Sequence, residues 1–174
     1  MLGRFCRWSF SAAILFALAG CDSGRCGAGE LCECAGGHQC YLDCDGDDCV
    51  QSCHDMDSCG AVCGDGCHFS CFQNNECSDY CGAGCTMDCH GTMTCGTICG
   101  AGCNYSCRSA SVCGARVGNG SVVLCEDVGS CAVECEGDCR VTCTRVGGNT
   151  CNVTCLGGGA PTSCGNGNVA CGPC

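Results

Sequence analysis

Polar and apolar residues alternate in short runs along the chain, and from residue 40 onward these runs recur with a period of 18 residues. One run per period has an apolar residue at its centre and a cysteine two residues away on each side, with serine replacing one cysteine in a single run. The central residues are Phe69, Met87, Tyr105, Val123 and Val141. Alternate side chains of an extended strand share a face, so the pattern predicts a short strand at each of these positions.

Glycines interrupt the repeats in segments of the form Cys-Gly-x-Gly-Cys. The recurring glycines are Gly64, Gly66, Gly82, Gly84, Gly100 and Gly102. The four-residue spacing of the cysteines also fits one face of a helix, but glycine disfavours helices and permits tight turns. We therefore predict two short strands and two turns in each repeat.

The repeats divide the chain into six units between two less regular segments. The units span residues 40–58, 59–76, 77–94, 95–112, 113–130 and 131–148, after an anchor and head at 21–39 and before a disulfide-rich tail at 149–174. A two-stranded unit cannot bury its own face, so neighbouring units should stack. We predict a mainly β fold, a thin β-solenoid of 18-residue repeats stapled by disulfides, with a small irregular disulfide-rich repeat domain as the alternative. The plan resembles the disulfide-stapled insect antifreeze solenoids but lacks their Thr-x-Thr ice-binding face.

Cysteine replaces the usual apolar core. The chain has 32 cysteines in 174 residues but only five phenylalanines, three tyrosines and one tryptophan. So few large side chains cannot bury the area that an ordinary core of this length buries, whereas such a cysteine content is typical of an exported disulfide scaffold. Residues 21–174 contain five arginines, no lysine and 18 acidic residues, a formal charge of −13. This charge excludes nucleic acid as a partner, because phosphate binding needs basic residues.

The unit at residues 113–130 predicts how the cysteines pair. Val117 and Ser121 stand where the other units have their second and third cysteines, and the joint loss indicates that these two positions bond to each other. The corresponding pairs are Cys44–Cys49, Cys63–Cys67, Cys81–Cys85, Cys99–Cys103 and Cys135–Cys139.

The remaining cysteines pair completely only if the fourth cysteine of each unit bonds to the first cysteine of the next unit, because closure within units leaves odd numbers at both ends. The resulting pairs are Cys26–Cys32, Cys34–Cys40, Cys53–Cys59, Cys71–Cys77, Cys89–Cys95, Cys107–Cys113 and Cys125–Cys131. Six tail cysteines then pair among themselves: Cys143, Cys151, Cys155, Cys164, Cys171 and Cys174. Staggered bridges of this kind would lock neighbouring units into a stiff rod.

The first 20 residues have the organisation of an export signal. Arg4 and Arg7 precede a short apolar stretch at residues 10–17, too short to span a membrane. Leu18-Ala19-Gly20-Cys21 then matches the lipobox, so the segment resembles a bacterial lipoprotein signal. The resemblance implies cleavage after residue 20 and lipidation of Cys21, which leaves 30 cysteines, an even number, for disulfides. An ordinary signal peptide cleaved at Ala17-Leu18-Ala19 is the alternative.

The lipoprotein resemblance implies a location in the bacterial cell envelope, with a lipid anchor in the membrane. Asp22 resembles the inner-membrane retention signal of enterobacteria, but sorting rules differ between bacteria, so the inner or outer membrane and the periplasmic or surface face stay open. The whole pattern resembles uncharacterised cysteine-rich repeat lipoproteins, a resemblance that implies no biochemical activity.

Three features suggest chemistry. Cys171-Gly172-Pro173-Cys174 resembles the active-site tetrapeptide of thioredoxin, but no helix can follow Cys174 to lower a thiol pKa, so a terminal structural bridge is the preferred interpretation. Candidate calcium ligands are Asp43, Asp45, Asp47 and Asp48, with Asp55 and Asp57 nearby, although a solvated acidic surface is the preferred interpretation. Soft metals at the thiols, with His38, His54, His68 and His90 as further ligands, would require reduced cysteines.

No nucleophile, base and orienting group can be assembled from the sequence, so we expect no catalysis and no resident cofactor. The preferred hypothesis is a lipid-anchored structural or binding and adhesion module of the cell envelope, whose protein or glycan ligand the sequence does not identify. A metal-binding protein and a thiol–disulfide oxidoreductase are the alternatives.

Overall fold

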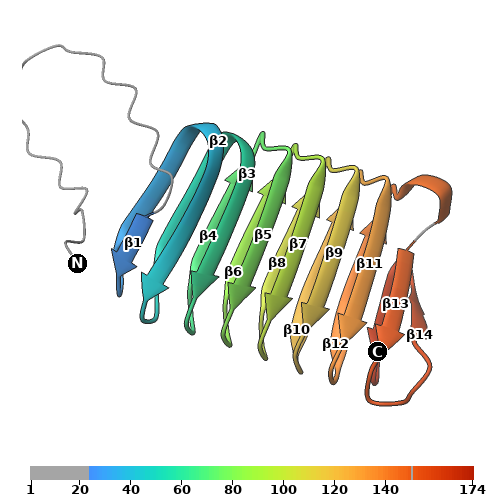
Figure 1. The fold of residues 1–174 in the computed structure, drawn as a ribbon. Coiled ribbons are helices and arrows are strands. Elements are labelled where there is room, and N and C mark those ends of the chain that lie inside the picture. The colour runs from blue at the N-terminus through green and yellow to red at the C-terminus, as the bar shows by residue number, and fades with distance from the viewer. Residues whose placement is uncertain (1–23, 150) are drawn as a thin grey trace, which may run out of the picture.

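The computed structural model describes residues 24–149 and 151–174, which form a β-solenoid of about seven turns (Figure 1). This confirms the predicted fold class and the choice of strands over helices. Among the described residues, no helix is both long enough and apolar enough to cross a membrane. Cys21, the predicted lipidation site, lies outside the described residues.

Fifteen strands and one short 3-10 helix make up the described chain. They are β1 (Gly24–Gly27), β2 (Leu31–Asp45), β3 (Val50–Cys63), β4 (His68–Phe72), β5 (Glu76–Cys81), β6 (Thr86–His90), β7 (Thr94–Cys99), β8 (Asn104–Arg108), β9 (Val112–Val117), β10 (Ser121–Glu126), β11 (Ser130–Cys135), β12 (Cys139–Thr144), η1 (Gly147–Asn149), β13 (Cys151–Cys155), β14 (Thr162–Gly165) and β15 (Asn168–Cys171).

The strands form two parallel ladders that face each other. We call β4, β6, β8, β10 and β12 the even face, and β5, β7, β9, β11 and β13 the odd face. The long strand β3 bends between the faces, because residues 50–54 pair with β4 and residues 58–63 pair with β5. Each coil therefore contributes one strand to each face, and in the described chain the side chains between the faces form a single layer of core.

The 18-residue period sets the register of both faces. On the even face, the predicted apolar residues form one continuous row in which each is the Cα partner of the next. This row consists of Phe69, Met87, Tyr105, Val123 and Val141, and all five side chains are at most 5% exposed. The inward row of the odd face is less uniform, and consists of Ala61, Asp79, Thr97, Ala115, Val133 and Val153.

All twelve predicted pairings outside the tail are present as disulfides. Ten of them join the end of one strand to the start of the next, while Cys34–Cys40 and Cys53–Cys59 span the bends inside the long strands β2 and β3. Each bridge thus closes a bend within one coil. We call the Cys-x5-Cys bends the long corners, and the bends such as Cys81–Cys85 the short corners. The staggered bridges join neighbouring 18-residue units as expected, and they do so at a bend within one coil. The coils themselves stack through backbone hydrogen bonds and packing.

The glycines of the short corner serve two different purposes. The amide of Gly82 donates to the carbonyl of Gly64 in the preceding coil at 2.9 Å, and the amide of Gly84 donates to Ala101 in the following coil at 2.8 Å. A Cβ on Gly100 would lie 2.9 Å from the Gly82 carbonyl carbon, so the first glycine permits this close stacking. The second glycine is in the left-handed region, with φ of 71° at Gly84.

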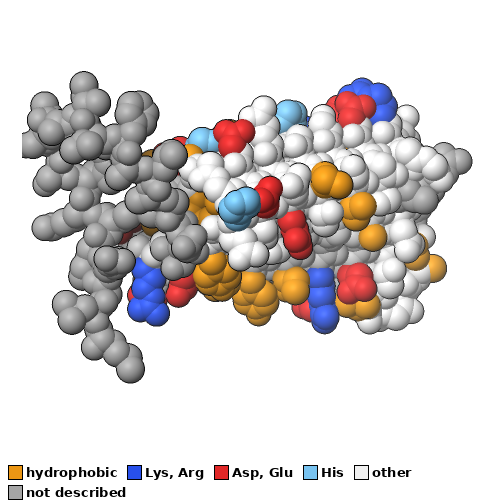
Figure 2. All heavy atoms as spheres, turned by 45° about the horizontal axis from the view of Figure 1, so that its top comes forward, with side chains coloured by type: hydrophobic (Ala, Val, Ile, Leu, Met, Phe, Trp, Pro, Cys, Tyr) orange, Lys and Arg blue, Asp and Glu red, His pale blue; other side chains and the backbone are white. Residues whose placement is uncertain are grey.

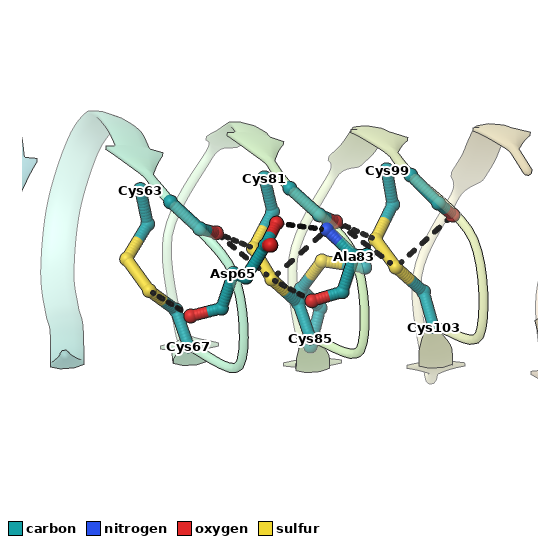
Figure 3. The surroundings of a disulfide bond; sticks show 12 residues. Cys63, Asp65, Cys67, Cys81, Ala83, Cys85, Cys99 and Cys103 are labelled. Carbon is teal, nitrogen blue, oxygen red and sulfur yellow. Dashed lines mark hydrogen bonds between the residues drawn. A yellow bond between two sulfur atoms is a disulfide. The ribbon is translucent and has the colours of Figure 1, made fainter. Parts of the chain in front are cut away.

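The short-corner disulfides Cys81–Cys85 and Cys99–Cys103 pack on the glycine carbonyl of the coil before them (Figure 3). The Cys99 and Cys103 sulfurs lie 3.4 and 3.5 Å from the Gly82 oxygen. A disulfide sulfur carries no hydrogen, so these are S···O packing contacts. Where the bridge is missing, the Ser121 hydroxyl accepts a hydrogen bond from the Cys103 amide at 3.1 Å and Val117 is completely buried.

The two ends of the solenoid depart from the expected boundaries. Strand β2 crosses the boundary expected between residues 39 and 40, and β1 stacks on residues 42–45, so the head continues the coils. In the tail, β13 stacks on β11, whereas β15 runs antiparallel to β12 and pairs with β14 to form a terminal hairpin (Figure 1).

Candidate functional site

The cysteines form no thiol site in the described part of the chain. All 30 described cysteines are bonded, in 15 disulfides. Several sulfur groups lie close enough to share an ion, for example Cys44, Cys49, Cys63 and Cys67, whose sulfurs are all within 4.8 Å of one another. A metal needs thiolate ligands, so these groups could bind one only after reduction.

The C-terminal tetrapeptide does not close on itself. Cys171 bonds to Cys155 of β13, and Cys174 bonds to Cys164 of β14. The interpretation of Cys171–Cys174 as one terminal bridge is therefore wrong, although both cysteines do form structural bridges. A thioredoxin-like centre alternates between a dithiol and a disulfide within the motif, and the arrangement found here instead joins the terminal hairpin to the last coil.

The acidic residues near the N-terminus lie in three separate places. Arg25 of β1 lies 3.6 Å from Asp43 and 3.7 Å from Asp45, so these two carboxylates have a basic neighbour. Asp47 lies at a short corner, where its Oδ1 accepts a hydrogen bond from the Asp65 amide of the next coil at 2.8 Å. Asp48 is in the same corner, in the left-handed region with φ of 58°.

Asp55 and Asp57 follow residues 50–54 of β3, in the long corner that the Cys53–Cys59 bridge closes. Asp47 and Asp48, which precede residues 50–54, are thus at the other bend of the coil. Asp57 accepts from Asn75 Nδ2 at 3.2 Å and contacts His38 at 2.6 Å. The candidate calcium ligands do not form one cluster, because the chain turns a corner between them.

His54 on the outer surface of β3 lies between two carboxylates. Its Nδ1 is 3.0 Å from Asp55 and its Nε2 is 3.1 Å from Glu33. The hydrogen bond with Asp55 raises the pKa of His54 and the one with Glu33 adds to this, against an opposing effect of partial burial. The imidazole also stacks on the Phe72 ring, with centroids 5.1 Å apart and planes 5° apart.

The structure reveals an inward-facing, half-buried carboxylate that the sequence pattern did not single out. Asp79 of β5 points into the core, where it lines a small cavity of about 10 Å³ with Phe69, Met87 and Tyr105. Burial raises the pKa of Asp79 to about 7, in spite of a hydrogen bond from Thr97 that lowers it. Burial, together with the Asp79 charge, raises the pKa of the Tyr105 hydroxyl, which has no hydrogen-bond partner among the described residues.

The outer surface of the odd face is partly apolar. Tyr80 and Ile98 are 58% and 49% exposed and follow Val62 in one row of side chains. The adjacent row contains Gly60, Ser78, Gly96 and Gly114. Figure 2 shows hydrophobic side chains gathered along the lower border of the view, with basic and acidic side chains at both ends of the row.

The even face has a groove on its outer surface. Its volume is about 330 Å³, and it is lined by Ser70, Cys71, Phe72, Gln73, Asp88 and His90. We call it the Phe72 groove. Ser70 and Phe72 on β4 are the Cα partners of Asp88 and His90 on β6, so one pair of neighbouring strands supplies most of the lining.

Sequence reasoning identified His90 but not the other side chains of the groove. The signal was present, because outward residues of successive units meet at an 18-residue spacing, and residues 70, 72, 88 and 90 obey it. The same spacing puts Phe72 between His54 and His90 in the register of the strands.

Comparison with protein-family models, with curated proteins and with solved structures returned no match to this chain.

Proposed function

We propose that the chain is an exported, lipid-anchored binding module of the bacterial cell envelope, which acts by presenting the surfaces of a rigid rod and not by catalysis. The proposal rests on one observation above all: every described cysteine is bonded in a disulfide. Such a network persists in oxidising compartments, and it leaves no described thiol for redox chemistry or soft metals.

The order of the coils supports an anchor at one end. The described chain begins at Gly24, three residues after Cys21, and β1 lies at one end of the stack while the β14–β15 hairpin lies at the other (Figure 1). A lipid on Cys21 would therefore hold the first coil near the membrane. Seven coils at about 4.8 Å each would place the terminal hairpin some 30–35 Å further out.

The surface supports binding to a partner rather than to nucleic acid or to an acidic membrane. Arginines are already paired with acidic residues, for example Arg116 with Glu136 at 2.8 Å and Arg145 with both Asp127 and Glu126. The excess charge is negative. What the surface offers instead is the exposed apolar row of the odd face and the Phe72 groove of the even face.

Replacement of Cys21 tests the anchor. We expect Cys21→Ser to release the protein from the membrane fraction or to block its processing, because the thiol that would carry the lipid is gone. Cys6→Ser is the matched control, since it removes a cysteine of the same segment outside the lipobox, and it should leave fractionation unchanged. Normal membrane partitioning of Cys21→Ser in a cell fractionation would reject the lipid anchor.

A further inference from the structure

We propose that the Phe72 groove binds a neutral saccharide, with one sugar ring packed on Phe72 and its hydroxyl groups bonded by Asp88, Gln73 and His90. The inference rests on the proposed binding function and specifies the ligand class that this function would take.

The aromatic ring is held in a position that suits stacking. His54 covers one face of Phe72 with nearly parallel planes, and the groove lies on the side of His90, the next residue in the same row. The three rings belong to three stacked coils, so the rigid backbone ladder fixes their spacing at about 4.8 Å per strand. A sugar ring presents C–H groups on its face, and an ordered aromatic ring offers the complementary apolar surface.

The polar side chains of the groove have free hydrogen-bonding capacity. Asp88 is half-buried, yet its carboxylate makes no hydrogen bond or ion pair with any described residue, and its Oδ1 is buried without a partner. The side chains of Gln73 and His90 likewise have no described partner. A carboxylate accepts from several hydroxyl donors, while an amide and an imidazole can both donate and accept. The neighbouring hydroxyl groups of a sugar can donate to the carboxylate and can donate to or accept from the amide and the imidazole.

The position of Gln73 is fixed by the fold. It lies in the long corner in the left-handed region, with φ of 57°, and its amide donates to the His90 carbonyl at 3.1 Å. Its exposed side chain therefore stands at the rim where β4 ends, beside the ring of Phe72.

Other ligand classes fit the groove less well. No lysine or arginine lines it, which disfavours phosphate, sulfate and carboxylate ligands. The backbones of β4 and β6 are hydrogen-bonded within the ladder, so a peptide cannot add as a strand. One carboxylate and one imidazole fall short of the three protein ligands of a catalytic zinc site. The volume is at the lower end of small-ligand sites, which suits a short part of a glycan.

The test uses the purified, oxidised protein on immobilised neutral oligosaccharides of glucose, galactose, mannose and N-acetylglucosamine, with sialylated and sulfated counterparts. We expect binding to neutral members, confirmed by calorimetry with the best of them. Phe72→Ala and Asp88→Asn should each weaken it at least about tenfold, because they remove the stacking surface and a charged acceptor. Tyr41→Ala, which removes an exposed aromatic ring on β2, and Glu134→Gln, on the outer surface of the odd face, are the matched controls and should bind like the wild type.

Circular dichroism of each variant shows that a loss of binding is not a loss of fold. Three results would overturn the inference: no binding to any neutral saccharide, binding that Phe72→Ala and Asp88→Asn both leave intact, or binding that appears only with added Zn²⁺ or Ca²⁺. Fractionation of the wild-type protein is independent of all three, so failure of the saccharide site and failure of the lipid anchor can be distinguished.

Discussion

The Thr97 hydroxyl donates a hydrogen bond of 2.9 Å to the Asp79 carboxylate across two stacked coils of the odd face. The even face opposite contributes Phe69, Met87, Asp88 and Tyr105 to the lining of this cavity. The Tyr105 hydroxyl stays protonated at neutral pH because its pKa is raised. No basic group is among the residues that line this cavity. Asp79 is thus a half-buried acid with one donor and no counter-charge in this cavity.

The pKa of Asp79 predicts how stability depends on pH. Its folded pKa of about 7 exceeds the ordinary value of 3.8, so the native state binds the proton more tightly than the unfolded state does. Stability from this group is therefore fully present below about pH 4 and is lost as the pH rises from about 4 to 7. Asp79→Asn should remove this dependence and raise the free energy of unfolding at pH 8 by a few kcal/mol. Urea titrations of the oxidised wild type and variant at pH 5 and pH 8 measure the free energy of unfolding at each pH. Asp138→Asn, an exposed carboxylate, is the control, and equal slopes for wild type and Asp79→Asn would contradict the prediction.

The close stacking at the short corner predicts a cost for a single methyl group. In Gly100→Ala the new Cβ would meet the Gly82 carbonyl and the Ala83 amide at 2.9–3.0 Å, and backbone atoms there cannot move aside without breaking the ladder. We expect a loss of about 1–3 kcal/mol in denaturant titrations. Gly157→Ala is the control, since nothing lies within 4 Å of its Cβ position. Equal stability of the two variants would mean that the coils stack more loosely than described.

The pairing of the long corners can be checked without a structure. Cys113→Ser should free the thiol of Cys107, because these two residues are bonded, and should leave Cys125 bonded to Cys131. Thiol labelling followed by peptide mapping distinguishes the two sites. A label on Cys125 instead would indicate closure within the units.

Reduction should unfold the solenoid. The core is a single layer between the two faces, in which many of the buried side chains are cysteines. In the chain-entropy model each short bridge contributes about 2–3 kcal/mol, and all fifteen bridges would be lost together. Far-ultraviolet circular dichroism before and after complete reduction at neutral pH measures the effect. A native β spectrum in the reduced protein would show that backbone ladders alone maintain the fold.

The regular part of the fold was predictable because a strict period determines register. Once Phe69 and Met87 are assigned to the same inward position, the strands, the corners and twelve disulfides follow. The tail has no such repeat, so its six cysteines left the partners open, and the reversed strand β15 was missed. In that strand Cys171 becomes the Cα partner of Cys139, and its bond to Cys155 takes the place of a short-corner bridge.

The candidate sites were harder to predict because proximity in sequence was a poor guide at the corners. Asp48 and Asp55 are seven residues apart but lie at opposite bends of one coil. Ser70 and Asp88 are 18 residues apart and are Cα partners on neighbouring strands. Asp79 escaped notice because its row otherwise holds alanine, valine and threonine, so a single carboxylate looked like an outward residue.

The short span of the repeat disulfides has a consequence for synthesis and for evolution. From Cys53 to Cys139 each bridge joins cysteines only four or six residues apart, so a newly synthesised coil carries both partners of every bond that it needs. Oxidation can then proceed from the N-terminus without waiting for later sequence. For the same reason, duplication or deletion of one 18-residue segment in the gene would leave no cysteine orphaned. The rod can thus change length over generations in steps of about 4.8 Å, while the terminal hairpin is inherited unchanged.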